Sequence, residues 1–163
     1  YLKLKNVTKS EKKINNFLIL IFLILVFCQI SIGAFVSGMD AGKIYNSWPL
    51  MGNTYFPDDS LFVSLFKLDA FSDPSLVQFM HRNLAYIILL FYFFLFYKIY
   101  KNKINKFFLI INVVGLLLLI QVVLGILTLI YGAQIKFASM HQISSIFLVS
   151  SSIYLLYKNL KTN

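Results

Sequence analysis

The chain has 163 residues, of which 59% are hydrophobic, 17% are aromatic and only 13% are charged, and its mean hydropathy is +0.77. Soluble globular domains are about 45–50% apolar and about 25% charged, so this composition indicates a membrane protein. Glycine (7) and proline (3) are too scarce for a collagen or a disordered chain. The single cysteine, Cys28, excludes an internal disulfide and a cysteine-based zinc site.

Long stretches without lysine or acid predict the membrane helices. They cover residues 14–39, 74–97, 107–135 and 137–157, and each can cross roughly 30 Å of hydrocarbon at about 1.5 Å per residue. We therefore predict an all-α membrane protein, a four-transmembrane-helix bundle over residues 14–158. The expected spans are about 14–38, 76–98, 107–131 and 137–158, with a leader at 1–13, an outer loop at 40–75 and a tail at 159–163.

The charge distribution predicts the orientation of this bundle. The leader, the turn at 98–106 and the tail lie on one side and carry eleven lysines against Glu11. The other side carries three lysines against five aspartates. The bundle would lie in a bacterial inner membrane or in the mitochondrial inner membrane. The positive-inside rule then places both termini on the inner side, in the bacterial cytoplasm or in the mitochondrial matrix. This topology accounts for the net charge of +9, so we expect no nucleic-acid partner. The expected partner of the helices is membrane lipid.

The outer loop is the one sizeable segment expected outside the membrane. Tyr45 and Trp48 are typical interfacial anchors. Residues 61–71 alternate apolar side chains with Lys67 and Asp69, which predicts a short helix lying in the interface. The loop is therefore expected to cap the outer end of the bundle.

The chain contains two histidines, and an apparent internal repeat relates them. The sequence Gln-x-x-x-Gly occurs at Gln29–Gly33 and again at Gln121–Gly125, and Met-His occurs at the start of the second and fourth spans, with His81 and His141. Both histidines are expected about 6–8 Å below the outer surface. Ionisable groups inside spans are costly and indicate function, so we expect the pair to share one ligand.

Haem iron fits two imidazoles, because it needs two axial ligands on opposite faces of its macrocycle. Zinc would need three or four protein ligands, and the spans offer neither Cys pairs nor carboxylates. Small residues near the histidines would leave room for such a flat group, although close helix packing uses the same residue types. They are Ala85, Ala138, Ser144 and Ser145 beside the histidines, with Gly33, Ser37, Gly38, Gly125 and Thr128 on the neighbouring spans. A haem in the outer half of the bundle is therefore predicted.

The expected spans also contain one arginine, Arg82, and one cysteine, Cys28. Arg82 follows His81 near the outer surface, where its guanidinium would pair either with a haem propionate or with a loop acid such as Asp73. Cys28 lies in an apolar run and is expected to be a buried, unreactive thiol.

As a set, these motifs resemble the haem A synthase family. The resemblance rests on segments in the family's order and spacing: Gly33–Gly42, Tyr45–Gly52, Val77–Arg82, Gln121–Thr128 and His141–Gln142. It extends from about residue 15 to 158 and corresponds to the second half of the family's eight-helix protein. It implies that His81 and His141 ligate a haem b and that Arg82 contributes to the same site.

The resemblance also implies a function and a set of partners. The full protein oxidises a methyl group of its substrate haem O to the formyl group of haem A, for respiratory oxidase assembly. Substrate and catalytic residues are expected in the N-terminal half of the same protein, and haem O synthase is a further expected partner. This half would serve electron transfer and would be inactive alone.

One alternative from another class stays open. A non-catalytic bis-histidine membrane cytochrome, an electron-transfer anchor, would present the same two ligands. A small transporter is disfavoured, because the spans carry no polar lining beyond their outer third.

Overall fold

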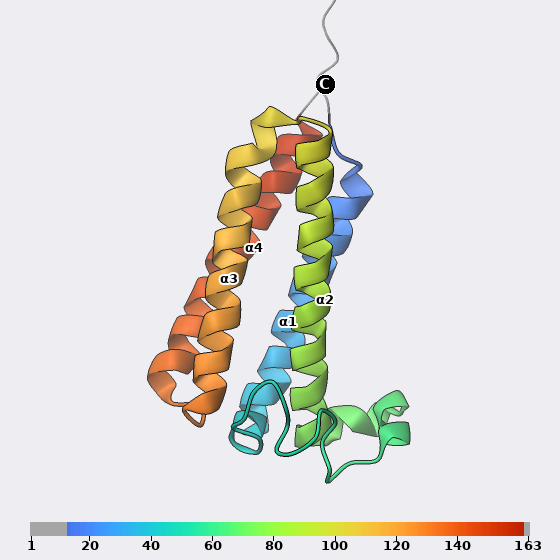
Figure 1. Ribbon diagram of the computed structural model, residues 1–163, viewed down its shortest axis with the longest axis vertical. Coiled ribbons are helices and arrows are strands. Elements are labelled where there is room, and N and C mark those ends of the chain that lie inside the picture. The colour runs from blue at the N-terminus through green and yellow to red at the C-terminus, as the bar shows by residue number, and fades with distance from the viewer. Residues whose placement is uncertain (1–12, 162–163) are drawn as a thin grey trace, which may run out of the picture.

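The computed structural model describes residues 13–161, so all but the last residue of the expected leader 1–13 lies outside the described residues. Within this range the chain forms four α-helices: α1 Asn16–Gly38, α2 Pro74–Lys101, α3 Phe108–Ile130 and α4 Ile135–Leu160. Each is long and apolar enough to cross a membrane. The predicted all-α, four-helix, multi-pass fold is confirmed. Figure 1 shows that α1 begins and α4 ends at the same end of the bundle.

Local sequence signals set the helix boundaries. Asn15 caps α1 by accepting a hydrogen bond from the Phe17 amide at 2.9 Å. Asp73 caps α2 by accepting from the amides of Ser75 and Leu76, at 2.9 and 3.2 Å, with Pro74 at the first helical position. Side-chain oxygens and proline suit these positions because the first amides of a helix have no partner within it.

The helices form two antiparallel pairs. α1 packs along α2 and α3 along α4; α1 also contacts α4, whereas α2 and α3 meet over a smaller surface. In Figure 1 the α3–α4 pair diverges from the α1–α2 pair toward the end that carries the loop. The two pairs are therefore most closely joined at the end of the bundle that holds the chain termini.

The buried apolar core lies in the half of the bundle near the termini. By contrast, no residue of 27–38 in α1 or of 135–147 in α4 is buried. The half of the bundle that carries the loop thus has no equivalent core between these helices. The core consists of Ile14, Ile19, Phe22, Val26, Ile88, Tyr92, Leu95, Ile99, Ile104, Phe107, Ile110, Ile111, Val114, Leu118, Leu148 and Leu155.

A buried asparagine closes the bundle at the lysine-rich end. The Asn159 amide nitrogen donates to the Ile14 carbonyl at 2.7 Å and to Asn16 Oδ1 at 2.6 Å, and Asn159 Oδ1 accepts from the Ile14 amide at 3.0 Å. Because Asn159 is fully buried, these bonds satisfy its polar atoms and fix the start of α1 against the end of α4.

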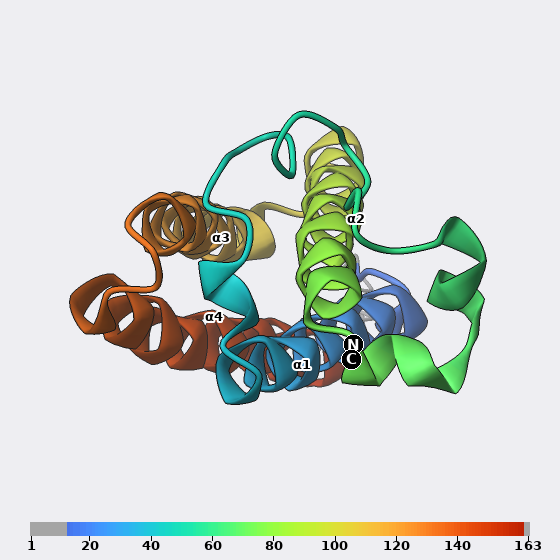
Figure 2. The same cartoon turned by 90° about the horizontal axis from the view of Figure 1, so that it is seen from below.

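The loop between α1 and α2 lies across the opposite end. Figure 2 shows its first turn, η1 (Ala41–Lys43), between α1 and α3, and its last part extending sideways beyond α2. The short helix predicted over 61–71 is instead two 3₁₀-helices, η2 (Phe62–Phe66) and η3 (Leu68–Ser72). Extended backbone at Lys67 separates them. A single helix would require this residue to be helical as well.

The prediction that Cys28 is buried is wrong, because its side chain is exposed. The buried residues of α1 are Ile19, Phe22, Leu23 and Val26, which face the neighbouring helices. A helix that is apolar on all sides carries no pattern to mark its lipid-facing side.

Candidate functional site

Both histidines lie in the outer half of the bundle, on different helix pairs. His81 is on α2 and His141 is on α4. Among the described residues no group of three or more His, Cys, Asp or Glu side chains could hold a metal ion. The site therefore offers two imidazoles and no third ligand of these types.

Gln29 and Gly33 of α1 both lie against His81. The Gln29 Nε2 donates to the main-chain oxygen of His81 at 3.0 Å and lies 3.2 Å from the Nε2 of the same imidazole. Gly33, one turn along α1, faces the ring so closely that an added Cβ would lie 3.0 Å from His81 Cε1. The ring thus lies against bare backbone, which only glycine provides there.

The surroundings of His141 repeat this arrangement. The Gln121 Nε2 of α3 donates to the main-chain oxygen of His141 at 3.1 Å. A Cβ on Gly125 would lie 3.3 Å from His141 Cε1. The Gln-x-x-x-Gly and Met-His segments of the sequence are therefore related in space as well as in spacing, one set in each helix pair.

The two sets differ in the second contact of the glutamine. Gln121 Nε2 also hydrogen-bonds to the Ser144 hydroxyl, one turn after His141. The corresponding residue after His81 is Leu84, and there the glutamine nitrogen lies against the imidazole itself. The two sets therefore match in the bond to the main-chain oxygen, but only His81 has a glutamine nitrogen beside its imidazole among the described residues.

These features fit two ligands of one haem iron. The Nδ1 atoms of both histidines are buried and have no hydrogen-bond partner among the described residues, although buried polar atoms are normally paired. Both rings lie against a glycine backbone. Neutral imidazole is a suitable axial ligand, and iron with two axial histidines needs no further protein ligand.

Arg82 reaches from α2 to the loop that covers this end of the bundle. Its Nη1 donates to the carbonyls of Ser47 and Leu50 at 3.0 and 3.2 Å, and its Nη2 donates to the carbonyl of Tyr45 at 2.9 Å. The Asp73 carboxylate instead accepts from the Ser60 hydroxyl and from the amides of Ser75 and Leu76, so the structure does not pair it with Arg82. The Nε of Arg82 is buried without a described partner, and its pairing with a propionate stays a prediction.

Further contacts that the sequence did not predict hold the loop over the site. Gln78 Nε2 donates to the Tyr45 carbonyl at 3.1 Å, and the Trp48 indole donates to the Tyr86 hydroxyl at 3.0 Å. The Tyr45 hydroxyl donates to Asp58 at 2.5 Å. Burial, this bond and the neighbouring carboxylates raise the pKa of Tyr45 to about 12, so the phenol is neutral and remains a donor.

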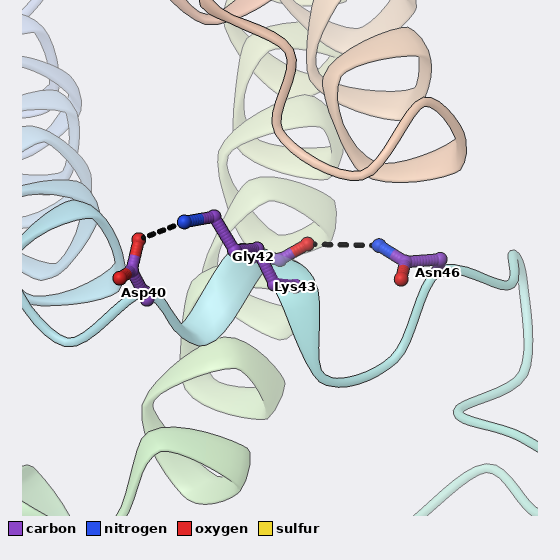
Figure 3. Close-up of polar contacts among 4 residues, drawn as sticks. All are labelled: Asp40, Gly42, Lys43 and Asn46. Carbon is purple, nitrogen blue, oxygen red and sulfur yellow. Dashed lines mark hydrogen bonds and ion pairs between the residues drawn. The ribbon is translucent and has the colours of Figure 1, made fainter.

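The start of the loop is tied to the other helix pair. Asn46 Nδ2 donates to the carbonyl of Gly42 at 2.9 Å and to the carbonyl of Leu129, near the end of α3, at 2.8 Å. Figure 3 shows the first of these bonds beside the Lys43–Asp40 ion pair, whose charged atoms are 2.7 Å apart. Through Asn46 and Arg82 the loop bridges α3, which carries Gln121 and Gly125, and α2, which carries His81.

Comparison with known proteins identifies the family. The model of the COX15-CtaA family, described as cytochrome oxidase assembly protein, matches residues 2–153. The chain belongs to this family. It is 42% identical over 159 residues to the heme A synthase of Pelagibacter ubique, an alignment that covers 97% of this chain and 46% of that protein.

Other relatives give the same result. The heme A synthase of Rickettsia prowazekii is 38% identical over 87% of this chain and 44% of its own length. That of Wolbachia pipientis is 38% identical over 83% of the chain and 37% of its own length. The chain therefore spans about half the length, or less, of the curated relatives it matches. No solved structure matches the chain.

Proposed function

We propose that the chain is the C-terminal, haem b-binding half of a haem A synthase, with His81 and His141 as the axial ligands of one iron. The observation that carries this proposal is the matched surroundings of the two histidines. Each ring lies against a glycine, and each main-chain oxygen accepts from a glutamine. Membership of the cytochrome oxidase assembly family supports the same function.

When bound, a haem with both axial positions occupied supplies one-electron transfer rather than oxygen binding. The residues of the chain hold and enclose this group. His81 and His141 are on different helix pairs, so ligation by both would also join the pairs where they diverge. Arg82 keeps the loop over the outer end and presents its unpaired Nε as a donor, which suits a propionate.

The reaction of the whole protein would be oxidation of haem O to haem A. We place its substrate site and catalytic residues in the N-terminal half of the same protein, because relatives are about twice as long as this chain. The helices α1 to α4 contain no Asp or Glu. Haem O and haem O synthase are then partners of the full enzyme, and membrane lipid surrounds the helices.

We propose that the lysine-rich end faces the cytoplasm or the matrix and the loop faces outward. Residues 98–106 and 158–161 of the described chain carry lysines without acids, whereas the loop carries five aspartates. This asymmetry supports the positive-inside orientation in a bacterial or mitochondrial inner membrane.

Absorption spectroscopy of the purified chain tests the haem site. The chain should carry low-spin b-type haem, and His81→Ala and His141→Ala should each abolish the low-spin spectrum. Gln142→Ala, beside His141 but with an exposed side chain, is the matched control and should leave the spectrum intact. Added imidazole should restore low-spin haem to either histidine variant. An unchanged spectrum in His81→Ala or His141→Ala would overturn the assignment.

A further inference from the structure

Two glutamines contact the histidines from the neighbouring helices. Gln29 and Gln121 each donate a hydrogen bond from Nε2 to the main-chain oxygen of the histidine opposite, at 3.0 and 3.1 Å. A carboxamide has its donors on one atom and its acceptor on the other, so a bond to a carbonyl oxygen decides which way the amide faces. Each glutamine therefore presents its NH₂ group, not its oxygen, toward the histidine.

The second N–H of Gln29 acts on the imidazole of His81. The two Nε2 atoms are 3.2 Å apart, and because the glutamine nitrogen can only donate, the imidazole nitrogen must accept. The proton of a neutral His81 then lies on Nδ1, which is buried without a described partner. An unpaired buried polar atom is unfavourable, so the hydrogen bonds of Gln29 hold Nε2 as the acceptor at the expense of Nδ1.

We propose that Gln29 and Gln121 are positioning residues that orient His81 and His141 as axial ligands, and that Gln29 alone also keeps the Nε2 of His81 unprotonated. This inference rests on the function proposed above. A metal ligand must offer an unprotonated ring nitrogen, and the hydrogen bond from Gln29 leaves the Nε2 of His81 in that state before a metal binds. On binding iron, the Nε2 of His81 would give up its hydrogen bond from Gln29, whereas the bond from Gln29 to the main-chain oxygen would remain and still position α1 against His81.

The glycines complete the orientation of each ring. Gly33 and Gly125 follow their glutamines by one helical turn, and a Cβ there would lie 3.0 Å from His81 Cε1 and 3.3 Å from His141 Cε1. Both distances are shorter than ordinary van der Waals contact, and the one at His81 is the tighter. Each ring therefore lies against a glycine of the neighbouring helix, and the ring of His81 is also contacted by Gln29 of that helix.

The two sides differ in a way that an experiment can use. Gln121 has its second contact with the Ser144 hydroxyl rather than with an imidazole nitrogen. Replacing Gln121 thus removes a bond to the main chain of His141 without removing one to its ring, and it serves as the matched control for Gln29.

Nitrogen-15 NMR of histidine-labelled, haem-free protein in detergent tests the role of Gln29. His81 should show a protonated Nδ1 and an unprotonated Nε2. Gln29→Met, which preserves length without a donor, should remove this preference, whereas Gln121→Met should leave the His81 signals unchanged. A proton on Nε2 of His81 in the unmodified chain, or the same tautomer in Gln29→Met, would overturn the proposal.

Electron paramagnetic resonance of the haem-loaded ferric protein tests ring orientation, because the g values of low-spin haem depend on the axial imidazole planes. Gly33→Ala should shift the largest g value, and Gly125→Ala should shift it less. Gly38→Ala is the control on the same helix, since nothing lies within 4 Å of its added Cβ. Identical spectra for Gly33→Ala and Gly38→Ala would refute the orientation by glycine. A native chain without any low-spin signal would refute the proposed function instead, while the NMR measurement would still decide the role of Gln29.

Discussion

Replacing Gly115 with alanine should destabilise the contact that joins the two helix pairs. Gly115 lies on α3 opposite Tyr92 of α2, and an added Cβ would lie 2.0 Å from the Tyr92 hydroxyl oxygen and 2.5 Å from its Cζ. Atoms do not approach so closely. Tyr92 is only 7% exposed, so its ring cannot swing into open space, and the ring or the helix must shift.

The expected cost combines three effects. Overpacking a buried site typically costs about 1–3 kcal/mol. The Tyr92 hydroxyl donates to the Ile111 carbonyl at 3.2 Å, and loss of this bond adds about 1 kcal/mol. Alanine favours the helix over glycine by up to about 1 kcal/mol, which offsets the lost bond. The free energy of unfolding should therefore fall by about 1–3 kcal/mol.

Unfolding of the chain in mixed micelles, followed by circular dichroism, measures this change. Gly38→Ala is the matched control and should retain native stability, because its Cβ meets nothing within 4 Å. Adding Tyr92→Phe to the Gly115→Ala chain removes the atom in closest conflict and should recover part of the loss. Haem content should fall with stability, because the two histidines lie on different pairs. Equal stability of the Gly115→Ala and Gly38→Ala chains would refute the packing argument.

Four further predictions concern the site and its surroundings. Arg82→Gln should lower the haem midpoint potential in a redox titration, because a nearby positive charge favours the reduced iron; an unchanged potential would exclude a nearby propionate partner. In a Cys28→Ser background, Asn53→Cys, at an exposed loop position, should react with an impermeant thiol reagent in intact cells. Reaction only after the inner membrane is opened would reverse the topology. The pKa of Tyr45 is raised from 10.0 to about 12 in the folded chain, so folding stability should fall as the pH rises from 10 to 12. Unfolding measurements over this pH range should show the fall, and the Tyr45→Phe chain should not show it. Expressed in a host that makes haem O but lacks haem A synthase, the chain alone should leave haem O unconverted in chromatography of extracted haems. Haem A produced by this chain alone would place the active site in this half.

Much of the fold could be predicted because each decisive signal is local. Four long apolar runs predict four helices whatever their packing, and Asp73 followed by Pro74 marks the start of α2. The two histidines stand out because ionisable residues are rare in such spans. These signals need no knowledge of which helix faces which.

The contacts of the site depend on helix rotation and loop conformation, which the sequence does not encode locally. The spacing of Gln29 and Gly33 is visible in the sequence, but their contact with His81 follows from how α1 packs on α2. For the same reason the exposure of Cys28 was mispredicted. Arg82 binds main-chain carbonyls, whose positions depend on the path of the loop and not on the identity of its residues.

The proposed role of this half in electron transfer agrees with the residue types of its helices. General acid–base catalysis needs a proton donor or acceptor within hydrogen-bond reach of the reacting centre, and the helices contain no carboxylate. The two imidazoles that could act in this way are the proposed ligands, and the nearest guanidinium, Arg82, is engaged with loop carbonyls. We therefore propose that this half holds a cofactor that exchanges electrons, and we place the groups that move the protons of a methyl oxidation in the other half of the protein. The proposed division of labour between the two halves of the protein follows from this difference.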